Sequence, residues 1–228
     1  MNPDPARELR EAHRLRRWIE RKLPPEALGR PLELFAELPS TNDYLKGLAL
    51  EGAPEGAAVV ALSQTRGRGQ PGRSWISPPN KGLYLSVLLR PPPERAEGPW
   101  LAAASALAVA DALTSAGVPA ISIKPPNDVL AHGRKIAGVL VEPRIGRRGM
   151  EFAVAGLGVN LTHGPDDFTA LPPERPATSC RMEAVELDLP GALLRVLVAL
   201  TERYRQLDPP RRAELSAAWS AFGGTATP

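Results

Sequence analysis

Short apolar runs alternate with longer amphipathic segments along the chain, and the two patterns predict different elements. Short runs of apolar residues bounded by Gly, Pro or polar clusters are typical of buried strands. Such runs predict strands at 32–38, 57–62, 83–89, 121–124, 135–141 and 152–157. Apolar residues that recur every three to four positions are typical of helices that bury one face. They predict helices at 4–23, about 43–50, 100–116, 190–207 and 211–221.

These elements divide the chain of 228 residues, which is long enough for one substantial core. We expect an N-terminal helix and linker at 1–31, a main domain at 32–222 and a frayed tail at 223–228. Residues 163–178 are rich in proline and polar residues and read as a surface loop. The first helix carries many arginines, which we interpret as a solvated face, because no recognition helix follows it.

Composition narrows the classes of function. The formal charge is only +3, which does not indicate a nucleic-acid-binding protein. A single cysteine, Cys180, excludes an internal disulfide and a cysteine-based zinc site, and the three histidines lack the spacing of metal ligands. No apolar run reaches the roughly 18 residues of a membrane span, and the charged N-terminus does not resemble a signal peptide. We therefore expect a soluble protein in the reducing cytoplasm.

The most informative segment is the loop between two predicted strands, which reads SQTRGRGQPGRSW over residues 63–75. Its glycines allow the backbone to approach a ligand closely, and its arginines offer forked donors that suit carboxylate and phosphate oxygens. The composition predicts an anion-binding loop, with an exposed turn that binds nothing as the alternative. The glycines also spell G-x-G-x-x-G, but Pro78, Pro79 and a strand follow where a dinucleotide site needs a helix.

Polar residues also stand at the ends of other predicted elements. Residues 40–42 read Ser-Thr-Asn before a helix, where capping accounts for one residue and a small polar ligand is the alternative for the others. Asn127 and Asp128 follow a strand, where they either form a turn or contact a ligand. Lys135 opens the next strand and Asn160 ends another, which places Asn160 to contact a ligand in the same crevice.

Five segments together resemble one family in their order, spacing and strand context. They are S-T-N at 40–42, Q-T-R-G-R-G-Q-P-G-R-S-W at 64–75, K-P-P-N-D at 124–128, K-I-A-G-V-L-V-E at 135–142 and G-L-G-V-N at 156–160. The chain resembles the biotin protein ligases, also called biotin–acetyl-CoA-carboxylase ligases, in the form without an N-terminal DNA-binding domain. The resemblance implies an α/β fold with a mixed sheet flanked by helices, similar to the catalytic core of class II aminoacyl-tRNA synthetases.

The resemblance also implies an activity and a set of site residues. Such enzymes join biotin to AMP with release of pyrophosphate, and then transfer biotin to a lysine of a biotin carboxyl carrier protein, a subunit of acetyl-CoA carboxylase. The residues implied to bind biotin are Ser40, Thr41, Asn42, Gln64, Gly67, Arg68, Gly69, Gln70, Lys135 and Gly138. Those implied to bind ATP are Arg68, Arg73, Trp75, Asn127, Asp128, Lys135 and Asn160. Arg68 and Lys135 are the implied catalytic residues, and Mg²⁺ would enter with the ATP phosphates, with Asp128 as its candidate ligand.

Three departures from the family pattern affect these expectations. Gln70 stands where the family loop usually has a second arginine, which puts retention of the adenylate in doubt or shifts that work to Arg66. Pro125 replaces a tryptophan of the K-W-P-N-D segment. Many members continue into a small C-terminal β-barrel, which we expect this chain to lack.

Three expectations concern partners and competing functions. We expect no nucleic-acid or membrane partner, and relatives suggest a homodimer that pairs sheet edges. A lipoate protein ligase is the alternative within the same superfamily, although those enzymes lack the arginine loop. A biotin-sensing binding protein without turnover is the alternative of a different class, and sequence-specific DNA binding would favour it.

Overall fold

A computed structural model describes residues 5–224 of the chain. Its α-helices are α1 (Pro5–Lys22), α2 (Thr41–Leu50), α3 (Gly98–Ser115), α4 (Leu189–Arg205) and α5 (Arg212–Ala221). Its strands are β1 (Leu32–Leu38), β2 (Ala58–Gln64), β3 (Gly82–Leu89), β4 (Ile121–Lys124), β5 (Asp128–Ala131), β6 (Arg134–Gly146) and β7 (Gly149–Asn160). Short 3-10 turns occur at Pro93–Arg95, Pro165–Phe168 and Pro209–Arg211. Residues 225–228 of the predicted tail lie outside the described residues.

The strands form one mixed sheet in the order β1-β2-β3-β7-β6-β5-β4. β1 and β2 are parallel, and the other neighbouring strands are antiparallel. Leu38 at the end of β1 pairs with Gln64, and Gly82 at the start of β3 pairs with Asn160. Asp128 at the start of β5 pairs with Gly138 of β6, which in turn pairs with Gly158 near the end of β7. This topology therefore brings the ends of the strands that carry the sequence motifs to one end of the sheet.

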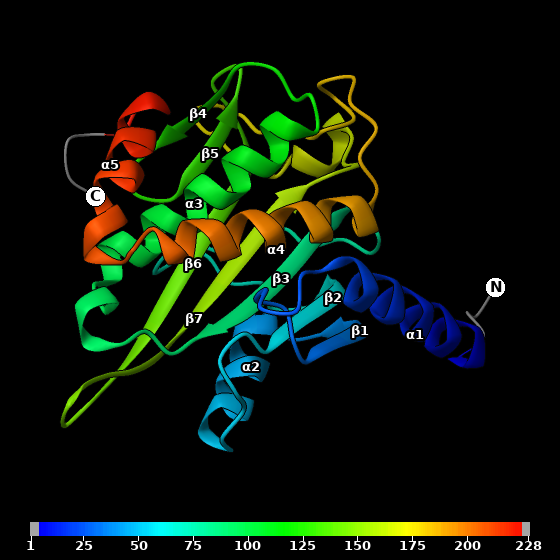
Figure 1. Ribbon diagram of the computed structural model, residues 1–228. Helices are drawn as coiled ribbons and strands as arrows, with labels where there is room; N and C mark the ends of the chain where they lie inside the picture. Colours follow the sequence, from blue (N-terminus) through cyan, green and yellow to red (C-terminus); the bar gives the residue numbers. More distant parts are fainter. Residues whose placement is uncertain (1–4, 225–228) are drawn as a thin grey trace.

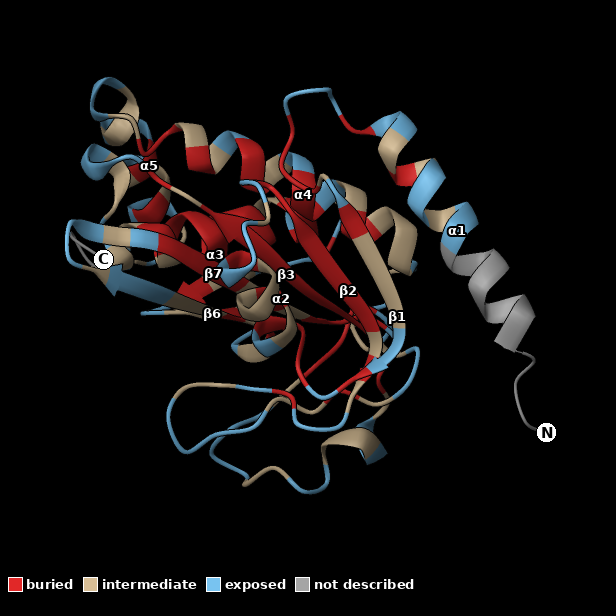
Figure 2. Cartoon of the chain, turned by 90° about the horizontal axis from the view of Figure 1, so that it is seen from below, coloured by how far each residue is buried: buried red, intermediate tan, exposed pale blue. Residues whose placement is uncertain are grey.

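Helices cover both faces of the sheet, as the buried faces of its strands require. In β2, Ala58 and Val60 contribute to one core and Val59 and Ala61 to the other, because successive side chains of a strand point to opposite faces. α3 and α4 lie side by side over the first face, and α2 packs on the second (Figure 1). The central strands are buried along most of their length (Figure 2).

The larger core joins the N-terminal segment to the rest of the molecule. Ile19 of α1 is fully buried and belongs to the same cluster as residues of α3 and α4. Alanines make up most of the buried positions of α3, and their small side chains allow α4 to approach closely.

Within the described part of the chain, no helix combines the length and the apolar character that crossing a membrane requires.

Three predictions about the elements need correction. β5 was not predicted, because its four residues follow a Pro-Pro pair and its first residue, Asp128, reads as a turn former. β6 and β7 are longer than predicted and form a hairpin that extends past the other strands (Figure 1). Residues 163–178 are not a surface loop throughout, since His163 and Thr178 are fully buried.

Candidate active site

A cavity of about 720 Å³ opens at the end of the sheet where the motifs meet. Its walls come from the start of α2, the loop after β2, the strands β3 to β7 and residues 168–177. The predicted site residues that line it are Ser40, Thr41, Asn42, Gln64, Arg68, Gly69, Gln70, Arg73, Trp75, Asn127, Asp128, Lys135, Gly138 and Asn160. Gly67 is the one predicted site residue outside this lining. The structure thus brings residues up to 120 positions apart around one cavity.

The start of α2 forms a polar wall of the cavity. Ser40 is the N-cap of the helix, and its hydroxyl accepts a hydrogen bond from the backbone N–H of Asp43 at 3.3 Å. This bond satisfies one of the unpaired N–H groups of the first turn. Oε1 of Gln64 accepts from the backbone N–H of Thr41 at 2.9 Å and from its hydroxyl at 3.2 Å. The end of β2 therefore fixes both the helix start and the side chains that face the cavity.

Two buried polar side chains, Asn42 and Ser86, continue this wall. The Ser86 hydroxyl donates to Oδ1 of Asn42 at 2.5 Å and lies 2.8 Å from the Thr41 hydroxyl. Nδ2 of Asn42 donates to Oε2 of Glu142 at 2.8 Å. Both ends of the Asn42 amide are thus bonded within the protein, as a side chain that is 4% exposed requires. The sequence reasoning missed Ser86, whose signal was a hydroxyl in the otherwise apolar run of β3.

The arginine loop folds back on itself, and its glycines serve that turn. The Gly69 N–H donates to the Arg73 carbonyl at 3.1 Å, and the Trp75 N–H donates to the Gly67 carbonyl at 3.0 Å. A Cβ on Gly67 would lie 2.5 Å from the Trp75 carbonyl oxygen, so no larger residue fits there. Gly72 has a φ of +77°, a left-handed conformation that glycine adopts without strain. We assign Gly67 to this close crossing of the chain.

Trp75, at the end of the loop, packs on the glycines of two central strands. A Cβ on Gly138 would lie 2.9 Å from the indole, and one on Gly158 would lie 2.6 Å from its Nε1. Because Gly138 and Gly158 have no side chains, β6 and β7 leave the space that the indole occupies. Nζ of Lys135 lies 5.3 Å from the ring centroid, within the range of a cation–π contact. The indole N–H is buried with no partner in the described part of the chain.

Polar contacts connect the far side of the cavity to the arginine loop. Nζ of Lys135 lies 2.5 Å from a carboxylate oxygen of Asp128. Nε2 of Gln70 donates to Oδ1 of Asn127 at 3.1 Å, while Nδ2 of Asn127 donates to the Val139 carbonyl at 2.6 Å. Gln70 therefore links the loop to the K-P-P-N-D segment, although it cannot supply the charge of an arginine.

Asn160 is buried, and its amide holds the backbone together. Its Nδ2 donates to the Thr178 carbonyl at 2.9 Å and lies 3.5 Å from the Lys135 carbonyl. These bonds connect the end of β7 to the start of β6 and to the segment that closes the cavity. That segment includes Phe168 and Leu171 among the lining residues, so it places apolar surface over the site. Its polar composition concealed this position in the sequence.

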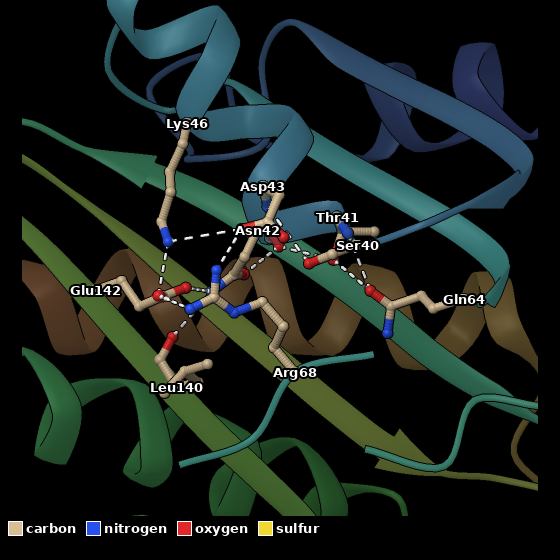
Figure 3. A network of polar contacts seen from close by, with 10 residues as sticks. Ser40, Thr41, Asn42, Asp43, Lys46, Gln64, Arg68, Leu140 and Glu142 are labelled. Atoms are coloured by element: carbon tan, nitrogen blue, oxygen red, sulfur yellow. Dashed lines mark hydrogen bonds and ion pairs between the residues drawn. The ribbon is translucent and has the colours of Figure 1, made fainter. Parts of the chain in front are cut away.

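Arg68 lies at the edge of the cavity between two carboxylates (Figure 3). Its Nη1 is 2.5 Å from Oδ1 of Asp43, and its Nη2 is 2.8 Å from Oε1 of Glu142. The hydrogen bond to Asp43 raises the pKa of the guanidinium, so Arg68 carries its charge at every physiological pH. The same Glu142 oxygen is 2.6 Å from Nζ of Lys46. Glu142 ends the K-I-A-G-V-L-V-E segment, and the motif alone indicated no role for it. Its three partners, Asn42, Lys46 and Arg68, lie far from it in sequence, so local pattern could not predict them.

No cluster of three or more His, Cys, Asp or Glu side chains with metal-binding geometry occurs among the described residues. Asp128 is the carboxylate that lines the cavity beside Lys135. Mg²⁺ commonly binds through one or two carboxylates together with substrate phosphates and water, and a dedicated protein cage is not needed. Asp128 fits that arrangement as a carboxylate that faces the cavity.

The fold resembles that of a solved biotin protein ligase from Aquifex aeolicus in complex with biotin and ATP. The TM-score is 0.67 at 30% identity, and the match covers 82% of this chain and 76% of that one. The chain belongs to the Biotin/lipoate A/B protein ligase family, whose pattern matches residues 34–160. The resemblance inferred from the five motifs is confirmed at this level.

Similarity to individual relatives extends beyond the family match. A biotin–[acetyl-CoA-carboxylase] ligase from Paracoccus denitrificans is 36% identical over 192 residues, which cover 82% of this chain and 79% of the relative. The bifunctional ligase/repressor BirA of Bacillus subtilis (strain 168) is 32% identical over 200 residues, 86% of this chain. The chain spans 61% of the length of that repressor.

Proposed function

We propose that the protein is an ATP-dependent ligase that adenylates biotin and transfers it to a lysine of a biotin carboxyl carrier protein. The observation that carries this proposal is one cavity in which a polar wall meets two cations, Arg68 and Lys135. The relatives named as biotin ligases cover most of this chain, which favours biotin over lipoate as the acyl substrate.

The acyl pocket in this proposal is the polar wall at the start of α2. The ureido head of biotin offers two N–H donors and one carbonyl acceptor, so it needs both kinds of partner. Hydroxyls at Ser40 and Thr41 and the amide of Gln64 supply them, while Asn42 holds the wall in shape. Gly138 would leave space beside the ring of the bound biotin. A side chain at this position would also collide with Trp75 or with Lys135.

The cations serve the first chemical step, in which the biotin carboxylate attacks the α-phosphorus of ATP. One carboxylate O–P bond forms, the bond to the β-phosphate oxygen breaks, and pyrophosphate leaves with the electron pair. Two anions approach each other in this step, so fixed cations lower the barrier. Arg68 and Lys135 would neutralise the carboxylate and α-phosphate, and Arg73 would bind the departing phosphates. Asp128 and the phosphates would hold Mg²⁺, which would supply further charge neutralisation there.

The nucleotide would occupy the outer part of the same cavity. Trp75 offers an aromatic face, and Phe168 and Leu171 of the segment at 168–177 offer further apolar surface. Asn127 and the backbone held by Asn160 would position the sugar and phosphates. In the second step the uncharged amine of the carrier lysine would attack the acyl carbon to form an amide bond. The bond between the acyl carbon and the phosphate oxygen would break, AMP would leave with that oxygen, and the nitrogen would give up one proton. An enclosed site keeps water away from the reactive anhydride until the lysine arrives.

Incorporation of biotin into a purified carrier domain tests this function. Mass spectrometry would follow the acylated carrier with wild type, Arg68→Ala and Lys135→Met, in the presence of biotin, ATP and Mg²⁺. We expect each variant to lose about 10²–10³ in rate, the usual cost of removing one charge-stabilising donor. Arg144→Ala is the control, because that exposed arginine lies in the β6–β7 hairpin. Unchanged acylation by Arg68→Ala would show that the loop has another role.

A further inference from the structure

Glu142 is the centre of the charged network beside the cavity. Its Oε2 accepts from Asn42 of the polar wall, and its Oε1 is paired with both Arg68 and Lys46 (Figure 3). The side chain is 18% exposed, so most of its surface is removed from water. A single carboxylate thus contacts both the acyl wall and a cation of the reaction.

The network is balanced in charge, since Asp43 and Glu142 face Arg68 and Lys46. Arg68 lines the cavity, whereas the other three are absent from its lining within the described part of the chain. Both terminal nitrogens of Arg68 are bonded to these carboxylates. An anionic ligand in the cavity therefore competes with Asp43 and Glu142 for the guanidinium.

We propose that Glu142 and Lys46 are positioning residues that hold Arg68 beside the cavity and allow an anionic ligand to recruit it. This inference rests on the proposed function only for the identity of that anion, the phosphates of a nucleotide. Glu142 keeps Arg68 at the cavity edge and Asn42 in the wall. Lys46 stays on Glu142 when Arg68 turns, so that the carboxylate is never left with a single neutral partner.

The contacts explain why release of Arg68 costs little when Lys46 is present. Asp43 is half exposed, so water takes over its hydrogen bonds. Glu142 is mostly buried, and an unpaired carboxylate there would be costly. Lys46 at 2.6 Å and Asn42 at 2.8 Å remain bonded to it. Without Lys46, Arg68 becomes the only cation on Glu142, and a ligand has to break that stronger attachment.

Binding of inorganic pyrophosphate, measured by calorimetry on the full chain at low salt, tests this arrangement without biotin chemistry. We expect Lys46→Met to weaken pyrophosphate binding about tenfold and Lys46→Arg to leave it within about twofold of wild type. Glu142→Gln combined with Lys46→Met should return the affinity to within about twofold of wild type, because no carboxylate then retains Arg68. Adding Arg68→Ala to that double variant should abolish the recovery.

Lys22→Met is the matched control, because it removes the same charge at an exposed position on α1. Pyrophosphate binding by Lys46→Met that equals the Lys22→Met value would overturn the proposal. So would a double variant as weak as Lys46→Met, or a wild type that binds no pyrophosphate. If pyrophosphate binding follows the expected pattern but no biotin reaches the carrier domain, the proposed function is wrong and the role of Glu142 stands.

Discussion

A substitution at Gly156 tests how rigidly Asn42 is held in the polar wall at the start of α2. It lies on β7 directly under Asn42, and a Cβ at this position would be 2.9 Å from Cγ of Asn42 and closer still to its Oδ1. That distance is shorter than real side-chain contacts allow, so Gly156→Ala has to displace the Asn42 amide. Asn42 is short, 4% exposed and bonded at both ends, so it has no free direction in which to move.

The cost follows from two effects of the added methyl group. Losing the Ser86–Asn42 hydrogen bond costs about 1 kcal/mol, and overpacking a buried site typically costs about 1–3 kcal/mol. We expect Gly156→Ala to lower the free energy of unfolding by about 2–4 kcal/mol and to weaken biotin binding. The measurements are urea unfolding followed by circular dichroism, and calorimetric titration with biotin.

Two other glycines make the comparison quantitative. Gly158→Ala meets Trp75, whose side chain is only partly buried on a loop, so we expect a stability loss of under about 1 kcal/mol. Gly47→Ala on α2 meets no atom within 4 Å, and it should stabilise the protein by about 0.5–1 kcal/mol. If Gly156→Ala unfolded at the wild-type urea concentration and bound biotin as tightly, Asn42 would not be fixed as described.

Two further predictions concern buried titratable groups. Burial lowers the pKa of His163 to about 4, so the stability that its neutral form contributes above pH 6.5 is lost as the pH falls toward 4. In urea unfolding, the free energy of unfolding of the wild type should fall by about 2 kcal/mol between pH 7 and 5 through this group. For His163→Leu the fall over the same range should be smaller by that amount. Burial raises the pKa of the Cys180 thiol to about 12, so a thiol-reactive disulfide reagent at pH 8 should modify Cys180 only as the protein unfolds; rapid modification of the native protein would contradict its burial.

The sequence was a good guide where local pattern determines the structure. The apolar runs predicted β1, β2, β3 and β4 nearly to their ends, because each run is bounded by turn or loop residues. The capping pattern at residues 40–42 located the start of α2, with Ser40 as its N-cap. The motif residues converge on one cavity because strand pairing brings their ends together.

Contacts distant in sequence were beyond this reasoning. Arg68 was predicted from its residue type, but its carboxylate partners come from α2 and from β6. The segment at 163–178 was assigned to the surface on composition, yet its backbone is hydrogen-bonded to the backbone of Lys135 and to the side-chain amide of Asn160, beside the cavity. Gly67 stays a prediction as a ligand contact, and its neighbours also place it at a close crossing of the chain. In each of these three cases tertiary packing, and not local pattern, decides the surroundings of the residue.

ATP–pyrophosphate exchange tests the central claim of acyl adenylation most directly. Purified protein would be incubated with labelled pyrophosphate, ATP and Mg²⁺, together with biotin, with lipoate or with neither acid. The proposed function predicts label in ATP only with biotin, because only the biotin carboxylate would be adenylated reversibly. Exchange with lipoate alone would make the protein a lipoate ligase, and absence of exchange with both acids would contradict adenylation in this cavity.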